Sequence, residues 1–583
     1  MKLIFDSMGK YKFAIAMAIF IKLIGTMTEL TLPYILEYMI DYVVPQGNMK
    51  NVVLWGLLMF AAAVICRQFN VMANLRAIDN AHRVSFDVRQ RLFNKTANLS
   101  GDKFDSFGLP SLISRMTSDS YNVQSAVQQL QSLCVRAPMM LFGGVIMTLI
   151  MDRVLAMILI IMLPILIMVV LFVSSKGIPL YTGVQKKLDT VVRIMRENIT
   201  GVRVIKALSK TDYEKQRFAK ANEDMTDRDI KAGTIMAIPA PFMQLCLNIG
   251  LTLVVIIGAV RVNSGTMQPG IILAFLTYFN MITMGVMGLN RIFMSMSKAS
   301  ASADRIAEVL NVQDEWTILK GTEDAVLDGD NFIKFENVSF SYGEDNNDTE
   351  FSDFAGGQRE YALNDISFSL KKGESLGIIG PTGCGKTTVI NLLMRFYDAG
   401  SGRVIIDGRD VRSYEKDELR KYFGVVFQND MVFKDTIRNN IDFERNLSEE
   451  ALWNSAVDAV ADEYINALDG KMEFEAAIKG ANLSGGQKQR LLVARALAGD
   501  PQILILDDSS SALDYKTDSM MRKAIKNNHK DSTLIMVAQR ISSIMDMDHI
   551  MVMDNGKCVG YGTHEWLMDN CQQYRETFTM QTS

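Results

Sequence analysis

The chain has 583 residues, of which 49% are apolar, and because this length exceeds what one compact core organises, we expect at least two domains. The formal net charge of −4 provides no clustered basic field for phosphate backbones, which excludes nucleic acid as an expected partner. Six cysteines without CxxC spacing and four histidines indicate neither a disulfide framework nor a zinc site.

Long apolar segments concentrate in the first half of the chain. A helix needs about 20 largely apolar residues to cross a bilayer, and six segments approach this length. The first has no small-residue cleavage site after it, so it is predicted to be a membrane helix rather than a signal peptide. The six predicted membrane helices are Phe13–Leu32, Val52–Met72, Cys134–Ile150, Val154–Val173, Ile235–Val260 and Ile271–Met287.

Two of the connections between these segments, residues 73–133 and 174–234, are long and rich in Lys and Arg. The positive-inside rule therefore places them in the cytoplasm. Much of their sequence is poor in Pro and Gly and rich in helix formers, so we expect the membrane helices to continue outward and turn back. Short contact helices are predicted at the turns, at Asp102–Phe107 and Thr211–Gln216. A separate soluble insert is the alternative.

Three ionisable residues lie within the apolar segments: Lys22, Glu29 and Arg67. They either line a cavity, or Lys22 snorkels or pairs with a neighbour while Glu29 and Arg67 lie near a membrane boundary. Methionine is abundant, with 38 residues, and its flexible thioether suits either a surface that repacks around varied ligands or an ordinary helical core. The methionines in question are Met139, Met140, Met147, Met236, Met243, Met281, Met284 and Met287.

The pattern changes after a polar, Ala-rich connector at residues 295–310. From residue 331 onward, β runs alternate with helical segments, as in an α/β domain. We therefore expect a membrane domain at residues 1–310, a linker at 311–330 and an α/β domain at 331–583. Residues 343–360 are acidic and contain Gly and Asn, which predicts a mobile loop.

A phosphate loop is predicted directly after the strand Ser375–Ile379 and before a helix. Its backbone N–H groups close around phosphate oxygens, Lys386 neutralises their charge, and Thr387 offers a hydroxyl to Mg²⁺. Asp507, at the end of the buried strand Ile503–Leu506, is the expected second Mg²⁺ ligand. ATP and Mg²⁺ are therefore the expected cofactors. The predicted ATP-binding residues here are Gly380, Pro381, Thr382, Gly383, Cys384, Gly385, Lys386, Thr387 and Thr388.

The segment Leu483–Gln487 (Leu-Ser-Gly-Gly-Gln) resembles the signature of ATP-binding cassette (ABC) proteins. Nearly the whole chain resembles an exporter-type ABC half-transporter, which implies an α-helical transmembrane domain, with six helices and long cytoplasmic extensions, fused to an α/β P-loop nucleotide-binding domain. The resemblance also assigns Tyr342 to stacking on adenine and Gln428 to linking Mg²⁺ with the membrane domain. The other matching positions are Phe107-Gly108, Ser114-Arg115, Glu197–Ala207, Ala299–Leu310 and Ser511–Asp514.

Two cassettes in that family enclose two ATP molecules, each between the phosphate loop of one subunit and the signature of the other. We accordingly expect the signature residues to bind the γ-phosphate of ATP held by a partner. These residues are Ser484, the amides of Gly485 and Gly486, and Gln487.

Two positions depart from the family pattern. Asp508 stands where the family has the glutamate that polarises the attacking water, and Gln539 stands where it has histidine. Aspartate is one methylene shorter, and a misplaced general base costs about 10² to 10⁴ in rate. Glutamine donates hydrogen bonds but carries no proton. The predicted catalytic positions, Asp508 and Gln539, therefore indicate a site that binds ATP and hydrolyses it poorly.

These residues predict one subunit of a heterodimeric exporter whose partner retains Glu and His. Such a protein would lie in the plasma membrane as a multi-pass subunit, with its nucleotide-binding domain in the cytoplasm, and would couple ATP to efflux of hydrophobic or amphipathic small molecules. The alternatives are an exporter-fold importer of siderophore-like compounds, a slow homodimeric lipid or drug exporter, and an ATP-gated channel or regulatory subunit. Without a peptidase domain before the first helix, a leader-cleaving peptide exporter is disfavoured.

Overall fold

The computed structural model describes residues 2–312, 316, 318, 331–342, 361–428, 430–509 and 512–582. They form two compact units, Met1–Ala97 with Leu109–Val312, and Asn98–Gly108 with Gln313–Ser583. The predicted loop at residues 343–360 and most of the predicted linker lie outside the described residues.

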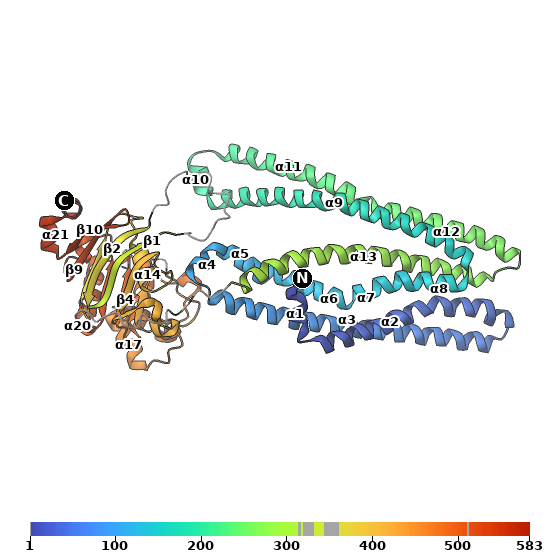
Figure 1. Cartoon of the computed structure of the whole chain (residues 1–583), viewed down its shortest axis with the longest axis horizontal. Coiled ribbons are helices and arrows are strands. Elements are labelled where there is room, and N and C mark those ends of the chain that lie inside the picture. The colour runs from blue at the N-terminus through green and yellow to red at the C-terminus, as the bar shows by residue number, and fades with distance from the viewer. Residues whose placement is uncertain are drawn as a thin grey trace. The chain divides into compact units, whose positions relative to one another are not determined.

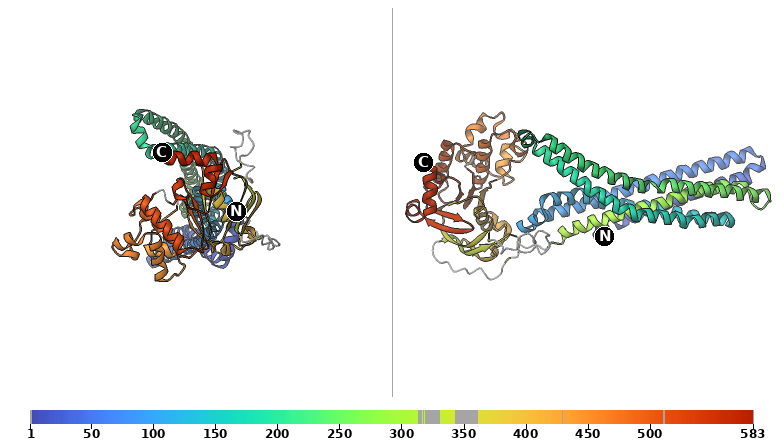
Figure 2. Two further views of the ribbon diagram at one scale, coloured as in Figure 1. Left: turned by 90° about the vertical axis from the view of Figure 1, so that its left-hand side faces the viewer. Right: turned by 90° about the horizontal axis from the view of Figure 1, so that it is seen from above.

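The first unit consists of long helices (Figure 1). Helix α2 packs against α3, α9 runs beside α11, and α13 packs against both α6 and α12 (Figure 2). The helical stretch Leu109–Met151 contains π-helical turns at Arg115–Asp119 and Met139–Gly143. The helices are α1 (Lys2–Gly9), α2 (Lys12–Tyr38), α3 (Met49–Ala97), α5 (Leu109–Ser114), α6 (Ser120–Gln131), α7 (Leu133–Pro138), α8 (Gly144–Met151), α9 (Arg153–Thr200), α10 (Val202–Ala207), α11 (Thr211–Ala237), α12 (Pro239–Asn263) and α13 (Pro269–Leu310).

Six membrane helices are approximately supported. Within the described residues, five helical stretches are long and apolar enough to cross a bilayer: Lys12–Gln46, Met49–Ala97, Leu109–Met151, Thr211–Asn263 and Pro269–Leu310. The remaining predicted segment coincides with a shorter apolar stretch of α9, Arg153–Val169.

One of the two predicted contact helices is confirmed. Helix α4 (Gly101–Phe107) contains Asp102–Phe107. The prediction at Thr211–Gln216 is wrong, because these residues are the first turns of α11 and the short helix is α10. Helix α9 ends at Thr200 before Gly201, and Ser209 adopts φ +53° between α10 and α11, so the chain turns earlier than expected.

The second unit contains two sheets. An antiparallel sheet has the order β2-β1-β4-β5, and the central sheet has the order β10-β9-β3-β8-β7-β6. In the central sheet β9, β3, β8, β7 and β6 are parallel and β10 is antiparallel. The strands are β1 (Asn331–Phe340), β2 (Leu363–Lys371), β3 (Ser375–Ile379), β4 (Ser401–Ile406), β5 (Arg409–Asp410), β6 (Phe423–Val426), β7 (Ile503–Asp507), β8 (Thr533–Val537), β9 (His549–Asp554) and β10 (Lys557–Gly562).

Helices pack against the central sheet, and a hydrophobic core lies against each of its two faces. Because side chains alternate along a strand, Ile503 and Ile505 pack with the antiparallel sheet and α14, whereas Leu504 and Leu506 pack with α17 and α19. The helices are α14 (Lys386–Leu393), α15 (Lys416–Arg420), α16 (Ile437–Asp442), α17 (Glu449–Asp458), α18 (Asp462–Ala467), α19 (Gly485–Leu497), α20 (Tyr515–Asn528), α21 (His564–Asn570) and α22 (Gln572–Thr582).

Candidate nucleotide site

The parallel strands bring three predicted segments to one edge of the central sheet. The carboxyl ends of neighbouring parallel strands lie together, which is where α/β folds bind ligands. β3 leads into the phosphate loop Gly380–Thr387, β7 ends in Asp507, and β8 leads into Ala538–Ile541, here called the switch loop. Asp507 and Val537 are paired across β7 and β8.

The phosphate loop has a backbone that requires glycine. Gly385 adopts φ +104°, and a Cβ there would lie 2.6 Å from the Ala362 carbonyl oxygen. A Cβ on Gly380 would lie 2.1 Å from the Met553 carbonyl oxygen. The loop then enters α14 at Lys386, so the N–H groups of the first turn point toward the loop. This backbone fits a phosphate group.

Two side chains of the loop have defined partners. The Lys386 ammonium donates to the carbonyl oxygens of Gly380 at 2.9 Å and Pro381 at 2.7 Å. The Thr387 hydroxyl donates to Asp507 Oδ2 at 3.2 Å. Asp507 is buried, and burial raises the pKa of its carboxyl. A hydroxyl and a carboxylate at this distance are the oxygen ligands that Mg²⁺ prefers, so Thr387 and Asp507 would hold the ion, which neutralises phosphate charge when bound.

Tyr342 lies close to the start of α14. Its hydroxyl is 3.1 Å from the Thr388 hydroxyl, and its ring packs edge-on against Phe340 and Tyr397. The side chain remains half exposed, so it offers an aromatic surface beside the phosphate loop. Gln428 is exposed and follows β6, which pairs with β7 at the same edge of the sheet.

The signature segment lies at a different place in this unit. Ser484 caps α19, with its hydroxyl accepting from the Gln487 N–H at 3.3 Å while the Gln487 side chain accepts from the Ser484 N–H at 2.8 Å. Gly485 and Gly486 approach Ala512 rather than the phosphate loop. The reciprocal cap satisfies the N–H groups of Ser484 and Gln487 and fixes the start of α19, where the helix dipole favours negative charge.

The two residues that depart from the family pattern contact each other. The Gln539 amide donates to Asp508 Oδ2 at 2.7 Å. Asp508 has φ +50°, and its N–H donates to the Val537 carbonyl at 3.0 Å. Aspartate tolerates this left-handed conformation better than most residues. The structure thus joins Asp508, which follows β7, to the switch loop after β8.

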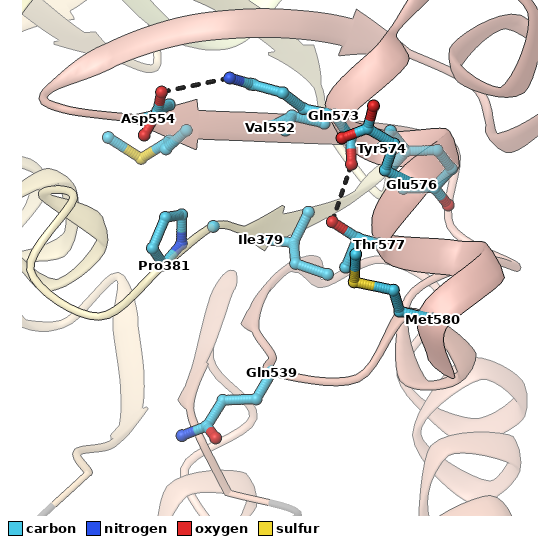
Figure 3. A pocket seen from close by; sticks show the side chains of 12 residues that line it. Ile379, Pro381, Gln539, Val552, Asp554, Gln573, Tyr574, Glu576, Thr577 and Met580 are labelled. Carbon is cyan, nitrogen blue, oxygen red and sulfur yellow. Dashed lines mark hydrogen bonds between the residues drawn. The ribbon is translucent and has the colours of Figure 1, made fainter. Parts of the chain in front are cut away.

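The last helix also contributes to this part of the domain, which the sequence does not indicate. Helix α22 and the start of the phosphate loop line a hollow of about 430 Å³, whose walls include Ile379, Pro381, Gln539, Asp554 and Met580 (Figure 3). The Gln581 side chain also bonds the switch loop. Helical propensity predicts α22 itself, but the local sequence contains no signal for a contact with residues 40 positions earlier.

Helix α4 belongs to the same compact unit, although it lies in the sequence between α3 and α5. The Gly101 N–H donates to the Phe396 carbonyl at 3.2 Å, and the Tyr397 hydroxyl donates to Asp105. The contact helix is thus joined to residues that directly follow α14.

The three ionisable residues within the predicted membrane segments differ in their burial and in their partners. The buried Lys22 ammonium donates to the side-chain oxygens of Asn70 at 2.8 Å and Asn74 at 3.1 Å. Glu29 forms an ion pair with Arg136 at 2.7 Å. Arg67 is exposed. Lys22 therefore has polar neighbours, as one of the two alternatives expects, and Glu29, expected only near a boundary, is paired as well.

The fold and the site define a multi-pass membrane protein with a P-loop nucleotide-binding domain. Residues 15–286 match the family model of the ABC transporter transmembrane region, and residues 363–511 match the model of the ABC transporter. The chain belongs to the ABC transporter family and has the exporter-type arrangement, with a membrane region and an ATPase domain in one polypeptide.

Similar proteins agree with this assignment along the whole chain. An uncharacterised ABC transporter ATP-binding protein of Bacillus subtilis, YfiB, is 32% identical over 98% of this chain and 97% of its own length. An ATP-dependent lipid A-core flippase of Syntrophus aciditrophicus is 29% identical over 86% of this chain and 80% of its own. A bacterial Atm1-family ABC exporter with ATP bound has the same fold, with a TM-score of 0.80 and 21% identity over 98% of both chains.

Proposed function

We propose that this chain is the subunit of a heterodimeric ABC exporter whose own nucleotide site, built on Lys386 and Asp507, binds ATP but hydrolyses it poorly. The Asp508–Gln539 contact supports this proposal most directly. A carboxylate that acts as general base must have an oxygen directed at the attacking water. In Asp508 the side chain is shorter than glutamate, and its Oδ2 accepts a hydrogen bond from an amide that carries no titratable proton.

The binding elements of the same site support retention of ATP. The phosphate loop, the Thr387–Asp507 pair and the half-exposed Tyr342 match a nucleotide and Mg²⁺. The capping box of Ser484 and Gln487 fixes the start of α19, which supports a role of the signature in binding the phosphate of a partner's ATP. The chain would then lend Ser484, Gly485 and Gly486 to a partner that carries Glu and His.

We further propose a membrane domain at 1–310, a linker at 311–330 and a nucleotide-binding domain at 331–583, the last in the cytoplasm and the whole in the plasma membrane. The substrate would be a hydrophobic or amphipathic small molecule. A slow homodimeric lipid exporter is the second candidate, because one relative is named a lipid A-core flippase.

The test restores the family residues. In the pair assembled with a partner whose own hydrolytic site is inactivated, Asp508→Glu combined with Gln539→His is expected to raise ATP hydrolysis by about 10² or more, because the base regains its reach and the switch position regains an imidazole. The same double variant with Lys386→Met is the control for contaminating ATPase. Brisk hydrolysis by the unaltered chain alone would refute the proposal of an impaired site.

A further inference from the structure

Gln581, in the last turn of α22, holds the switch loop by two hydrogen bonds. Its side-chain oxygen accepts from the Ile541 N–H at 2.8 Å, and its side-chain nitrogen donates to the Gln539 carbonyl at 2.8 Å. One amide therefore bridges two backbone groups on either side of Arg540. Such a two-point contact restrains a loop more than a single bond does.

Helix α22 is itself fixed to the domain. Tyr574 is buried, and its hydroxyl lies 2.8 Å from His564 Nδ1. Phe578 packs against the His564 ring, with centroids 5.3 Å apart, and joins the core beneath α17 and α19. These contacts lie one turn and two turns before Gln581, so the position of its amide follows from a packed helix.

The space beside this contact is open. The hollow separates Met580 and other residues of α22 from Ile379 and Pro381 at the start of the phosphate loop (Figure 3). Ala538 and Ile541 of the switch loop are buried in the same core as Tyr574. The bonds of Gln581 add a directional link to this packing, and one of them holds the exposed residue Gln539.

From this contact the side chain of Gln539 extends toward Asp508. The residue whose backbone Gln581 holds is the residue whose amide donates to Asp508 Oδ2 at 2.7 Å. A path of three hydrogen-bonded groups therefore runs from α22 to the catalytic position after β7.

We propose that Gln581 is a positioning residue that holds Gln539 in the ATP site, so that α22 sets how tightly this chain retains ATP. This inference rests on the proposed assignment of Gln539 to the nucleotide site. Gln581 contacts the switch loop rather than nucleotide, and it therefore acts through Gln539.

The test is photolabelling of this chain with 8-azido-ATP in the assembled full-length transporter, in the cold, with the subunits separated by electrophoresis. Gln581→Ala is expected to raise the half-saturating nucleotide concentration about fivefold, since two net hydrogen bonds to the switch loop are lost. Gln581→Glu keeps the shape of the side chain but places a carboxylate against the Gln539 carbonyl. The half-saturating nucleotide concentration is therefore expected to rise at least as much as in Gln581→Ala. Gln572→Ala is the matched control, because that amide bonds Glu576 of its own helix.

The double variant Gln581→Ala/Gln539→Ala separates positioning from general packing. If Gln581 acts through Gln539, the double variant labels like Gln539→Ala alone, whereas a merely structural role gives additive losses. Additive losses, or unchanged labelling of both Gln581 variants while Gln539→Ala weakens labelling, would overturn this inference alone. No effect of Gln539→Ala would instead remove the assignment of Gln539 to the site, and the inference with it.

Discussion

At the scale of residues, Asp507 shows a conflict between stability and metal binding. Its carboxylate is buried and accepts a hydrogen bond from the Thr387 hydroxyl at 3.2 Å, and burial disfavours the ionised form. An amide of the same shape still accepts that hydrogen bond. Functional sites commonly keep such residues at the expense of stability.

We therefore expect Asp507→Asn to raise the melting temperature of the nucleotide-binding domain by about 2 °C or more when no nucleotide is added. The same variant should lose the additional stabilisation that Mg²⁺ and ATP give together. Thermal unfolding of the full chain, with and without MgATP, measures both effects. Asp514→Asn is the control, since Asp514 is an exposed helix cap whose amide replacement retains the bond to the Thr517 N–H; a lower melting temperature for Asp507→Asn would contradict the expectation.

Which residues could be predicted from sequence depends on how local their role is. The phosphate loop, Asp507 and the signature are short patterns attached to a strand or helix end, and the structure places the first two at one edge of the sheet. Gln539 and Asp508 could be singled out, but not their contact. Gln581 was not predicted, because a side chain that bonds a distant backbone has no periodicity or motif to reveal it.

At the scale of elements, α4 depends on a glycine. A Cβ at Gly101 would lie 2.8 Å from the Phe396 carbonyl oxygen and 3.1 Å from the Tyr397 ring. Backbone atoms cannot move aside as a flexible side chain does, so Gly101→Ala is expected to shift α4 away from Phe396 and weaken the Tyr397–Asp105 hydrogen bond.

We predict that Gly101→Ala lowers the amount of substrate transported per ATP hydrolysed about threefold or more, because a small displacement of a positioned element is enough to impair coupling. Transport and ATPase measured on the same proteoliposomes give this ratio. Gly56→Ala in α3 is the matched control, since a Cβ there meets nothing within 4 Å. An unchanged ratio would show that α4 tolerates the displacement.

The sequence-based prediction of helices is wrong at the turn between α9 and α11, where the short helix is α10 rather than Thr211–Gln216. The helix-forming run at Thr211–Gln216 predicts a separate short helix, yet its acidic residues Asp212 and Glu214 lie in the first turn of a long helix, where the helix dipole favours negative charge. Gly201 and the left-handed Ser209 bracket the true short helix, α10. Apolar length alone placed the membrane helices well, because the bilayer imposes it.

At the scale of the whole molecule, the proposed heterodimer predicts unequal effects of two substitutions in this chain. Ser484 would serve the competent site of the partner, whereas Lys386 would serve the impaired site. Removing one preorganised phosphate donor costs about tenfold or more in hydrolysis. In the assembled pair, Ser484→Ala is therefore expected to reduce ATP hydrolysis by this factor, and Lys386→Met is expected to leave most of it.

The control for Ser484→Ala must account for its helix cap, whose loss alone costs about 1 kcal/mol. Ser448→Ala removes an equivalent cap, since the Ser448 hydroxyl accepts from the Ala451 N–H at 3.2 Å at the start of α17. ATPase of the three variants is compared at saturating MgATP. Equal losses from Ser484→Ala and Lys386→Met would indicate two equivalent sites and favour the homodimer.

The two bonds of the Lys386 ammonium to Gly380 and Pro381 change how a lysine substitution is interpreted. Besides offering positive charge, this side chain is a non-covalent cross-link within its own loop, and a neutral replacement removes the cross-link together with the charge. Arginine restores the charge but not the compact geometry of the ammonium. A neutral substitution of Lys386 therefore removes a positive charge and also loosens the backbone that leads into α14. A loss of ATP hydrolysis in such a variant reports both effects, and its interpretation should include the looser loop.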